Sequence, residues 1–257
     1  MQTQPILVLK WWGAMAHFRK FYTNSSSLSY AFPPRTVIMG MLSGIVGYER
    51  DTYYDRFDPE DFYCAVELVA PVRKISQTVN YIFAKSAKDL NRSSGSTQIP
   101  LEIILSRHSK KHGYSRVCYR LFIRHRDLNI MREWQHRAQT GSFYYPPCFG
   151  LSEFSSQLEY EAWIDGEKIS ELPSGTQTEI HSVCSMSGVE PKGLELDLWG
   201  TRQYLKERMP RHFSGNRQLT ETEQYIFEQQ GKSISGTFRH PVTCIELDGT
   251  KKNIMWM

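Results

Sequence analysis

One turn of the sequence has the residue types that bind phosphate, and it stands directly before a predicted helix. Pro33 and Pro34 precede Arg35 and Thr36, and a helix is predicted over about residues 34–48 with Pro34 in its first turn. The first N–H groups of a helix lack partners within the helix and carry a partial positive charge. An arginine and a threonine beside them suit an anion such as a phosphate group.

Three glycines on this helix suggest that another group approaches its backbone closely. Gly40, Gly44 and Gly47 are spaced i, i+4 and i+7, so they share one helix face. Each glycine costs a helix roughly 0.8–1.0 kcal/mol relative to alanine. Two explanations remain open at this point: close contact with the backbone of a nucleic acid, or tight packing of the helix on a sheet.

Basic residues are concentrated in one part of the chain. Residues 73–126 hold twelve Lys or Arg and two acidic residues, so the segment carries +10 while the rest of the chain carries −6. Such a block in a mildly acidic protein predicts contact with a polyanion, and a solvated charged face is the alternative.

Few residues suit acid–base or metal chemistry. His17 and the pair Lys111–His112 are the candidates for metal-free RNA cleavage, in which one group deprotonates the 2′-hydroxyl and another protonates the leaving oxygen. A histidine among lysines is more typical of a simple RNA contact. The acidic run between Asp51 and Asp61 reads as a solvated loop or a subunit contact, so we expect no metal and no cofactor.

Cysteine spacing and hydropathy indicate the compartment. The five cysteines lie far apart and form no CxxC pair, which favours a reducing environment over a disulfide framework or a zinc site. No apolar run approaches about 18 residues, and no basic segment precedes an apolar one at the start of the chain. We expect a cytoplasmic protein that does not enter a membrane.

The elements that position these residues alternate between strands and helices. Residues 5–12 predict a strand, 62–83 one or two strands, and 127–139 a second helix. Residues 101–108 and 114–125 predict two strands joined as a hairpin across Gly113. The order is that of a β-α-β-β-α-β unit, and the chain beyond residue 140 is predicted to be mostly β.

The segment SLSYAFPPRTVIMGMLSGIVGYERD, residues 27–51, resembles the signature of the Cas-five family, a subunit of type I CRISPR surveillance complexes (Cascade). GAMAHFRKFY at 13–22 is similar to the family's loop after the first strand, and PPCFGLSEF at 146–154 resembles its glycine-centred turn. Residues 208–227 resemble its C-terminal region, and the branch of type I-B systems is favoured.

The resemblance implies an α+β fold with two parts. It implies a ferredoxin-like (RNA-recognition-like) domain over residues 1–140 with an inserted basic hairpin thumb around 84–112, and a β-rich C-terminal region over 141–257. A member of this family caps one end of Cascade, binds the 5′ handle of the CRISPR RNA, and docks against a backbone subunit and the large subunit. Proximity to the target DNA stays open.

The expected RNA-binding residues come from two sources. Those carried over from the resemblance, or lying in the loop that resembles the family's, are Arg19, Lys20, Tyr30, Pro34, Arg35, Thr36 and Gly40. Those added because of their charge are Lys85, Lys88, Arg92, Lys110, Lys111 and Arg116.

Catalysis is not expected. The branch of type I-C systems cuts precursor RNA with a Tyr, a Lys and a His, and the matching positions here hold Val46 and, near the expected pair, Ile130 and Met131. We therefore expect a non-catalytic RNA-binding subunit. The alternative is a metal-independent endoribonuclease that processes precursor CRISPR RNA, and a third reading is an RNA-binding protein outside CRISPR systems.

Overall fold

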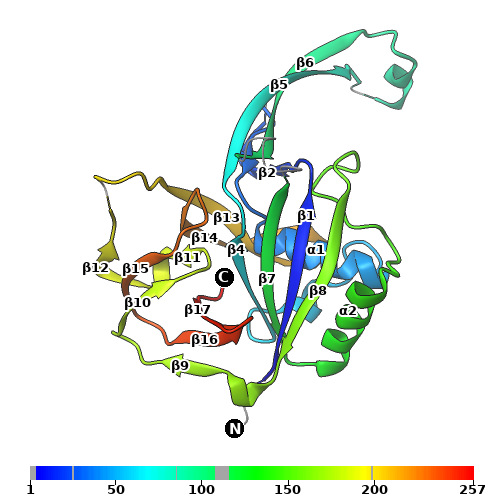
Figure 1. The fold of residues 1–257 in the computed structure, drawn as a ribbon. Helices are drawn as coiled ribbons and strands as arrows, with labels where there is room; N and C mark the ends of the chain where they lie inside the picture. The colour runs from blue at the N-terminus through cyan, green and yellow to red at the C-terminus, as the bar shows by residue number, and fades with distance from the viewer. Residues whose placement is uncertain (1–3, 25, 85, 108–115, 198) are drawn as a thin grey trace.

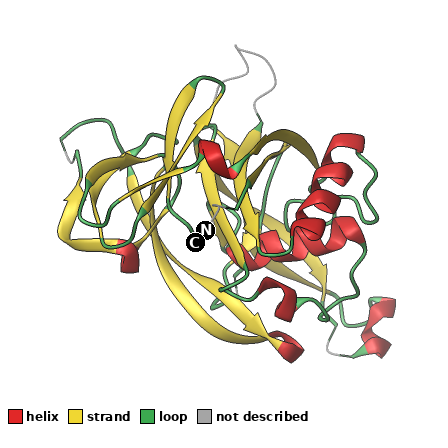
Figure 2. Ribbon diagram, turned by 90° about the horizontal axis from the view of Figure 1, so that it is seen from below, coloured by secondary structure: helices red, strands yellow, loops and turns green. Residues whose placement is uncertain are grey.

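A four-stranded antiparallel sheet with two helices on one face forms the centre of the molecule (Figures 1 and 2). The computed structural model describes residues 4–24, 26–84, 86–107, 116–197 and 199–257. The strand order is β4-β7-β1-β8, and each neighbouring pair is antiparallel. The elements are β1 (Ile6–Gly13), α1 (Arg35–Val46), β4 (Phe62–Leu68), β7 (Val117–His125), α2 (Leu128–Thr140) and β8 (Ser156–Ile164).

Both faces of this sheet are covered, which explains why β1 is apolar along most of its length. Leu7, Leu9 and Trp11 join the core beneath the two helices. Ile6 and Val8 point the other way and pack in a second core with residues of the C-terminal strands. The mixed α/β fold therefore places the sheet between the helices and a β-rich region.

The arginines of β7 lie on this second face and do not form part of a free basic surface. Arg120 donates to Glu67 Oε2 at 2.7 Å and to Glu161 Oε2 at 2.6 Å, and Lys252 pairs with Glu67 Oε1 at 2.6 Å. Arg124 lies 4.9 Å from the centre of the Trp256 ring. The charge block in the sequence is thus divided between structural ion pairs and the surface.

A long hairpin projects from the body (Figure 1). Its strands are β5 (Val72–Ile82) and β6 (Ser96–Ser106), paired in register along their whole length, with the short helix η2 (Ala87–Asn91) near the tip. The predicted hairpin between residues 101–108 and 114–125 is wrong, because β6 pairs with β5 and β7 pairs with β1 and β4. The polar, turn-rich residues 84–95 connect the two long strands.

The chain beyond α2 is mostly β, as predicted. β8 lies past residue 140, where the sequence predicted a domain boundary, yet it completes the first sheet beside β1. Among the described residues, no helix has the length and apolarity needed to cross a bilayer. The remaining elements are β2 (Phe18–Arg19), β3 (Ser29–Tyr30), η1 (Tyr54–Phe57), η4 (Gly166–Lys168), β9 (Ser170–Leu172), β10 (Gln177–Ile180), β11 (Cys184–Ser185), η5 (Met186–Gly188), β12 (Val189–Glu195), β13 (Tyr204–Ser214), η6 (Gly215–Arg217), β14 (Gln218–Glu228), β15 (Ile234–Phe238), β16 (Val242–Leu247) and β17 (Thr250–Ile254).

The antiparallel pair β13–β14 connects this region to the helix layer. Met209 of β13 and Tyr225 and Phe227 of β14 are buried in the same core as α1. This pairing also brings the turn between β13 and β14 to the side of the molecule where α1 begins, which is the side that carries the cleft described below.

We predict that Glu67→Gln destabilises the protein by about 3 kcal/mol, because a buried carboxylate that pairs with two cations would be lost. Urea unfolding measures the change. Asp61→Asn is the matched control, since its carboxylate pairs with the exposed Arg126 and such pairs contribute about 1 kcal/mol or less. Equal small losses in both variants would contradict a structural role for the Glu67 cluster.

Candidate nucleic-acid interface

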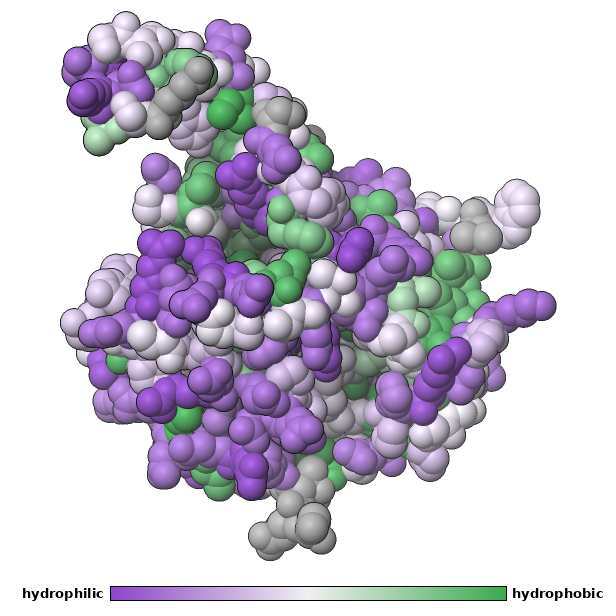
Figure 3. Space-filling view, turned by 180° about the vertical axis from the view of Figure 1, so that it is seen from behind, coloured by the Kyte–Doolittle hydropathy of each residue, from purple (hydrophilic) through white to green (hydrophobic). Residues whose placement is uncertain are grey.

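A cleft of about 750 Å³ lies between the hairpin and the body. Figure 3 shows the hairpin as an arm that stands away from the body, with hydrophobic side chains in the hollow beside it. Six parts of the chain line the cleft: residues 17–24 with 26–27, the first turns of α1, residues 53–54, the inner side of the hairpin, residues 150–151, and β13 with the turn that follows it. Segments far apart in the sequence therefore meet here.

His17 holds the first of these segments in place. Its side chain is 2% exposed, Nδ1–H donates to the Glu102 carbonyl at 2.7 Å, and Nε2 accepts from the Ser27 hydroxyl at 3.0 Å. Burial lowers the pKa of His17. Both ring nitrogens of the neutral tautomer are thus engaged, so this histidine positions the loop against β6 rather than offering a free acid or base.

Gly150 closes the floor of the cleft. Its φ is +88°, and a Cβ at this position would lie 1.8 Å from the His17 carbonyl oxygen. Only glycine permits both this conformation and this contact. The close approach of the backbone at His17 therefore explains why the segment 146–154 has a glycine at position 150.

Charged residues in the cleft fall into paired and unpaired groups. Lys20 Nζ lies 2.5 Å from Glu207 Oε2, and Lys74 lies 3.3 Å from the other oxygen of the same carboxylate. Burial alone would lower the pKa of Lys20, but the hydrogen bond and charge of Glu207 raise it overall. Arg19 and Arg217 also line the cleft, and the structure gives them no carboxylate partner among the residues it describes.

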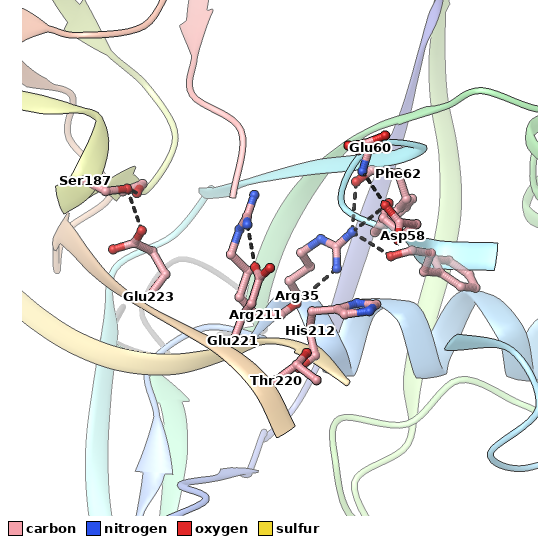
Figure 4. Close-up of polar contacts among 12 residues, drawn as sticks. Arg35, Asp58, Glu60, Phe62, Ser187, Arg211, His212, Thr220, Glu221 and Glu223 are labelled. Atoms are coloured by element: carbon pink, nitrogen blue, oxygen red, sulfur yellow. Dashed lines mark hydrogen bonds and ion pairs between the residues drawn. The ribbon is translucent and has the colours of Figure 1, made fainter. Parts of the chain in front are cut away.

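Arg35 does not face the cleft, in contrast to its predicted role as a phosphate contact. Its side chain is fully buried. The guanidinium donates to three backbone carbonyls, those of Phe57 at 2.8 Å, Phe62 at 2.9 Å and Arg211 at 3.0 Å (Figure 4). Arg35 therefore joins the start of α1 to the chain before β4 and to β13.

Tyr30 is also buried, and it donates its hydroxyl to the Arg208 carbonyl at 2.8 Å. Its predicted contact with RNA is replaced by a bond between β3 and β13. Pro34, Thr36 and Gly40 do line the cleft, as do Arg19 and Lys20. The first turn of α1, which has no side-chain cap, thus forms one wall.

The three glycines of α1 have different surroundings. Among the described residues outside the backbone of the helix itself, a Cβ at Gly40 would meet only the Tyr53 hydroxyl, at 3.3 Å, and one at Gly44 would have nothing within 4 Å. Gly47 ends the helix with φ +84° and lies against the Tyr144 ring, so α1 stops at Val46 rather than at Tyr48. Tight packing on the sheet therefore does not explain Gly40 or Gly44.

The charge-based candidates are divided. Lys88 and Arg92 are exposed near the tip of the hairpin. Arg116 lies before β7, over the Trp12 ring, and it is not among the residues that line the cleft. Lys85, Lys110 and Lys111 lie outside the described residues.

The residues of the cleft that sequence reasoning did not predict include Tyr53, Phe213 and Arg217. Tyr53 follows the helix in the acidic segment, and the other two lie at the turn between β13 and β14. Arg217 has a positive φ of 59°. The segment 208–227 was a signal in the sequence, but nothing local showed that its turn meets α1.

No metal centre is present among the parts of the chain that the structure describes, where no three His, Cys, Asp or Glu side chains gather closely enough. The acidic run has local roles instead. Asp51 accepts from the Tyr54 hydroxyl at 2.5 Å, and Asp58 accepts from the Glu60 N–H at 2.9 Å.

Comparison with known proteins gives a family model and several similar solved structures. The family model described as CRISPR-associated protein (Cas_Cas5) matches residues 6–106, from β1 to the end of β6. The chain is similar to a CRISPR protein from Archaeoglobus fulgidus, with a TM-score of 0.56 and 11% identity, over 97% of this chain and 99% of that one. It is also similar to a chain of a CRISPR RNA-guided surveillance complex, with a TM-score of 0.50 and 13% identity, over 92% and 91% of the two chains.

These identities are low, so the two solved structures establish a shared fold. A search of curated protein sequences found no match.

We predict that Arg35→Met lowers the free energy of unfolding by about 3 kcal/mol or more, because each hydrogen bond from a charged group contributes about 1.5–3 kcal/mol. Urea unfolding measures it. The control is Arg50→Met, since Arg50 is 81% exposed and should change stability by about 0.5 kcal/mol or less. An Arg35→Met protein as stable as the unsubstituted one would contradict the buried role.

Proposed function

Because the chain belongs to the Cas-five family of CRISPR-associated proteins, we propose that it is a subunit of a type I CRISPR surveillance complex and that it binds the 5′ handle of the CRISPR RNA in the cleft. The observation that carries the proposal is the cleft itself. It brings together, in one cavity, two arginines without a carboxylate partner among the described residues, an uncapped helix start and the inner side of the hairpin.

The cleft offers two kinds of contact to an RNA backbone. Arg19 and Arg217 supply charge without a competing carboxylate among the described residues, and Pro34, Thr36 and Val37 at the start of α1 line the same space. Gly40 adds no side chain to the wall, so a sugar or phosphate approaches the helix backbone directly. These contacts would hold an RNA backbone without reading its sequence.

The proposed function also suggests roles for the sheet, the hairpin and the C-terminal region. The four-stranded sheet with α1 and α2 is proposed to be the ferredoxin-like domain, and the hairpin β5–β6 its thumb. Lys88 and Arg92 near the tip would contact RNA or a neighbouring backbone subunit, and the β-rich C-terminal region would contribute to docking against the large subunit. The type I-B branch remains part of the proposal.

We propose that the subunit does not cut RNA. Val46, Ile130 and Met131 stand where the cleaving branch has its reactive groups, and Met131 is fully buried. His17 lies beside the cleft with both ring nitrogens engaged. The chemistry of 2′-hydroxyl attack would need a base that these residues do not supply.

We predict that the purified protein leaves labelled repeat RNA intact in the presence of EDTA. Gel electrophoresis after long incubation measures the product. Specific cleavage that is lost in His112→Ala or His17→Ala would overturn the non-catalytic assignment and favour the endoribonuclease.

We also predict that Gly40→Leu weakens binding of the handle RNA at least about tenfold, a change of about 1.4 kcal/mol. The leucine enters the cleft, and a shift of the Tyr53 hydroxyl accommodates it. Stability should not fall, because leucine favours a helix over glycine by roughly 0.8 kcal/mol. RNA titration and thermal unfolding on the same samples measure both effects.

Gly47→Ala is the matched control on the same helix. A Cβ there would lie 2.6 Å from the Tyr144 ring at a positive φ, so this variant should lose stability while its folded fraction binds RNA normally. Normal RNA binding by a stable Gly40→Leu protein would show that the RNA lies elsewhere.

A further inference from the structure

Arg116 is stacked on Trp12 at one end of the central sheet. The guanidinium lies 3.8 Å from the centre of the indole ring, which is contact distance. Trp11 is buried beneath the helices, and successive side chains of a strand alternate, so Trp12 points to the opposite face of the sheet. In register, Trp12 lies between Cys118 of β7 and Gln157 of β8.

Among the described residues, the C-terminal strands that cover the other end of the sheet do not cover this end. Ile6 and Val8 of β1 pack against the C-terminal strands, but Trp12 does not belong to that core. Trp12 is half-buried, and Arg116 and Gln157 are exposed. The indole and its guanidinium therefore form the floor of an accessible surface.

A second cavity, of about 260 Å³, opens at this stack. Trp12, Arg116, Ser155 and Gln157 are among the residues that line it. Drug-sized ligands occupy cavities of about 300–1,000 Å³, so this one suits a smaller group with a flat ring. An aromatic ring, a planar cation, an amide and a hydroxyl are the groups that recognise a nucleobase.

The charge at this cavity favours nucleic acid over a protein partner. Within the described part of the chain no carboxylate pairs with Arg116, whereas Arg120 on the same strand pairs with two. A guanidinium that is stacked and lacks an anion presents both a flat face and free N–H donors. A nucleobase could stack on the flat face of the Arg116 guanidinium while a phosphate accepts from its N–H groups.

We propose that Trp12 and Arg116 form a second RNA site, which binds one unpaired base of a single strand by stacking, with the Gln157 amide at its edge. The residues of this site are not those of the cleft between hairpin and body. The proposed site at Trp12 and Arg116 binds a nucleobase, whereas the cleft binds the sugar-phosphate backbone of the RNA. A failure here would leave the proposed function of the cleft unchanged.

The chain contains a matched control for this stack. Arg132 of α2 lies 3.8 Å from the Trp163 ring centre, the same distance as in the Arg116–Trp12 pair. Arg132 is also bonded to Gln135 at 2.9 Å, so its guanidinium is held within its own helix. Substitutions of Arg132 and Trp163 therefore remove the same charge and the same kind of stack but leave the proposed base site intact.

The experiment uses the full chain and a short single-stranded RNA that carries iodouridine. Trp12→Leu and Arg116→Gln should each weaken binding about 5- to 100-fold, the range for loss of one stacked base. Trp12→Phe should retain most of the binding. Trp163→Leu and Arg132→Gln should bind as the unsubstituted protein does. Ultraviolet cross-linking followed by mass spectrometry should place the iodouridine on the peptide that contains Trp12.

Thermal unfolding on every variant shows that the comparison is made on folded protein. Gly40→Leu, which blocks the cleft, should lose affinity but retain the cross-link to Trp12. Unchanged binding in Trp12→Leu and Arg116→Gln, equal losses in the control pair, or a cross-link elsewhere would each overturn the proposal. A protein partner would be indicated if these variants bound RNA normally but failed to assemble.

Discussion

The buried guanidinium of Arg35 is the interaction on which the geometry of the cleft depends. A cation in the interior is costly unless it is hydrogen-bonded, and here backbone carbonyls from two distant segments accept from both terminal nitrogens of the guanidinium. Burial lowers the pKa of Arg35, yet an arginine stays charged, so the donors persist. The start of α1 is therefore fixed against β13 and against the chain before β4, and the cleft wall is fixed with it.

Pairing, rather than net charge, separates the structural cations from those available to a ligand. Arg120 and Lys252 are balanced by Glu67 and Glu161, and Lys20 shares Glu207 with Lys74. These clusters join strands from different parts of the chain. The cations left without a carboxylate among the described residues include Arg19 and Arg217 on the cleft, Lys88 and Arg92 near the hairpin tip, and Arg116 over Trp12. Only some members of the basic segment are therefore left available to a polyanion, and contact with one stays a prediction.

Local pattern predicted the elements, and distant contacts decided how they pair. The strand at 5–12 and the helices at 34–48 and 127–139 follow from periodicity and caps, and they appear at β1, α1 and α2 within two residues. The partner of β6 was wrong because adjacency in sequence favoured β7, while the longer polar strand β5 matches β6 along its full length. The role of Arg35 was not predictable, since one of its acceptors belongs to Arg211, 176 residues away. The sequence around Arg35 does not distinguish an arginine that binds a phosphate from one that donates to backbone carbonyls.

Helix α1 carries the connection between fold and function because its two sides obey different constraints. One side is buried and holds Arg35, Ile38, Leu42 and Ile45, so core packing and the guanidinium fix its position. The other side carries Gly40 and Gly44, although glycine weakens a helix. Among the described residues outside the backbone of the helix itself, an added Cβ there would meet only the Tyr53 hydroxyl at Gly40 and no atom within 4 Å at Gly44. Because packing of the buried side stabilises the helix, the helix tolerates the destabilising glycines on its open side. A bare helix surface held rigidly at the wall of a cationic cleft allows a polymer backbone to approach closely, and a flexible surface of long side chains would not.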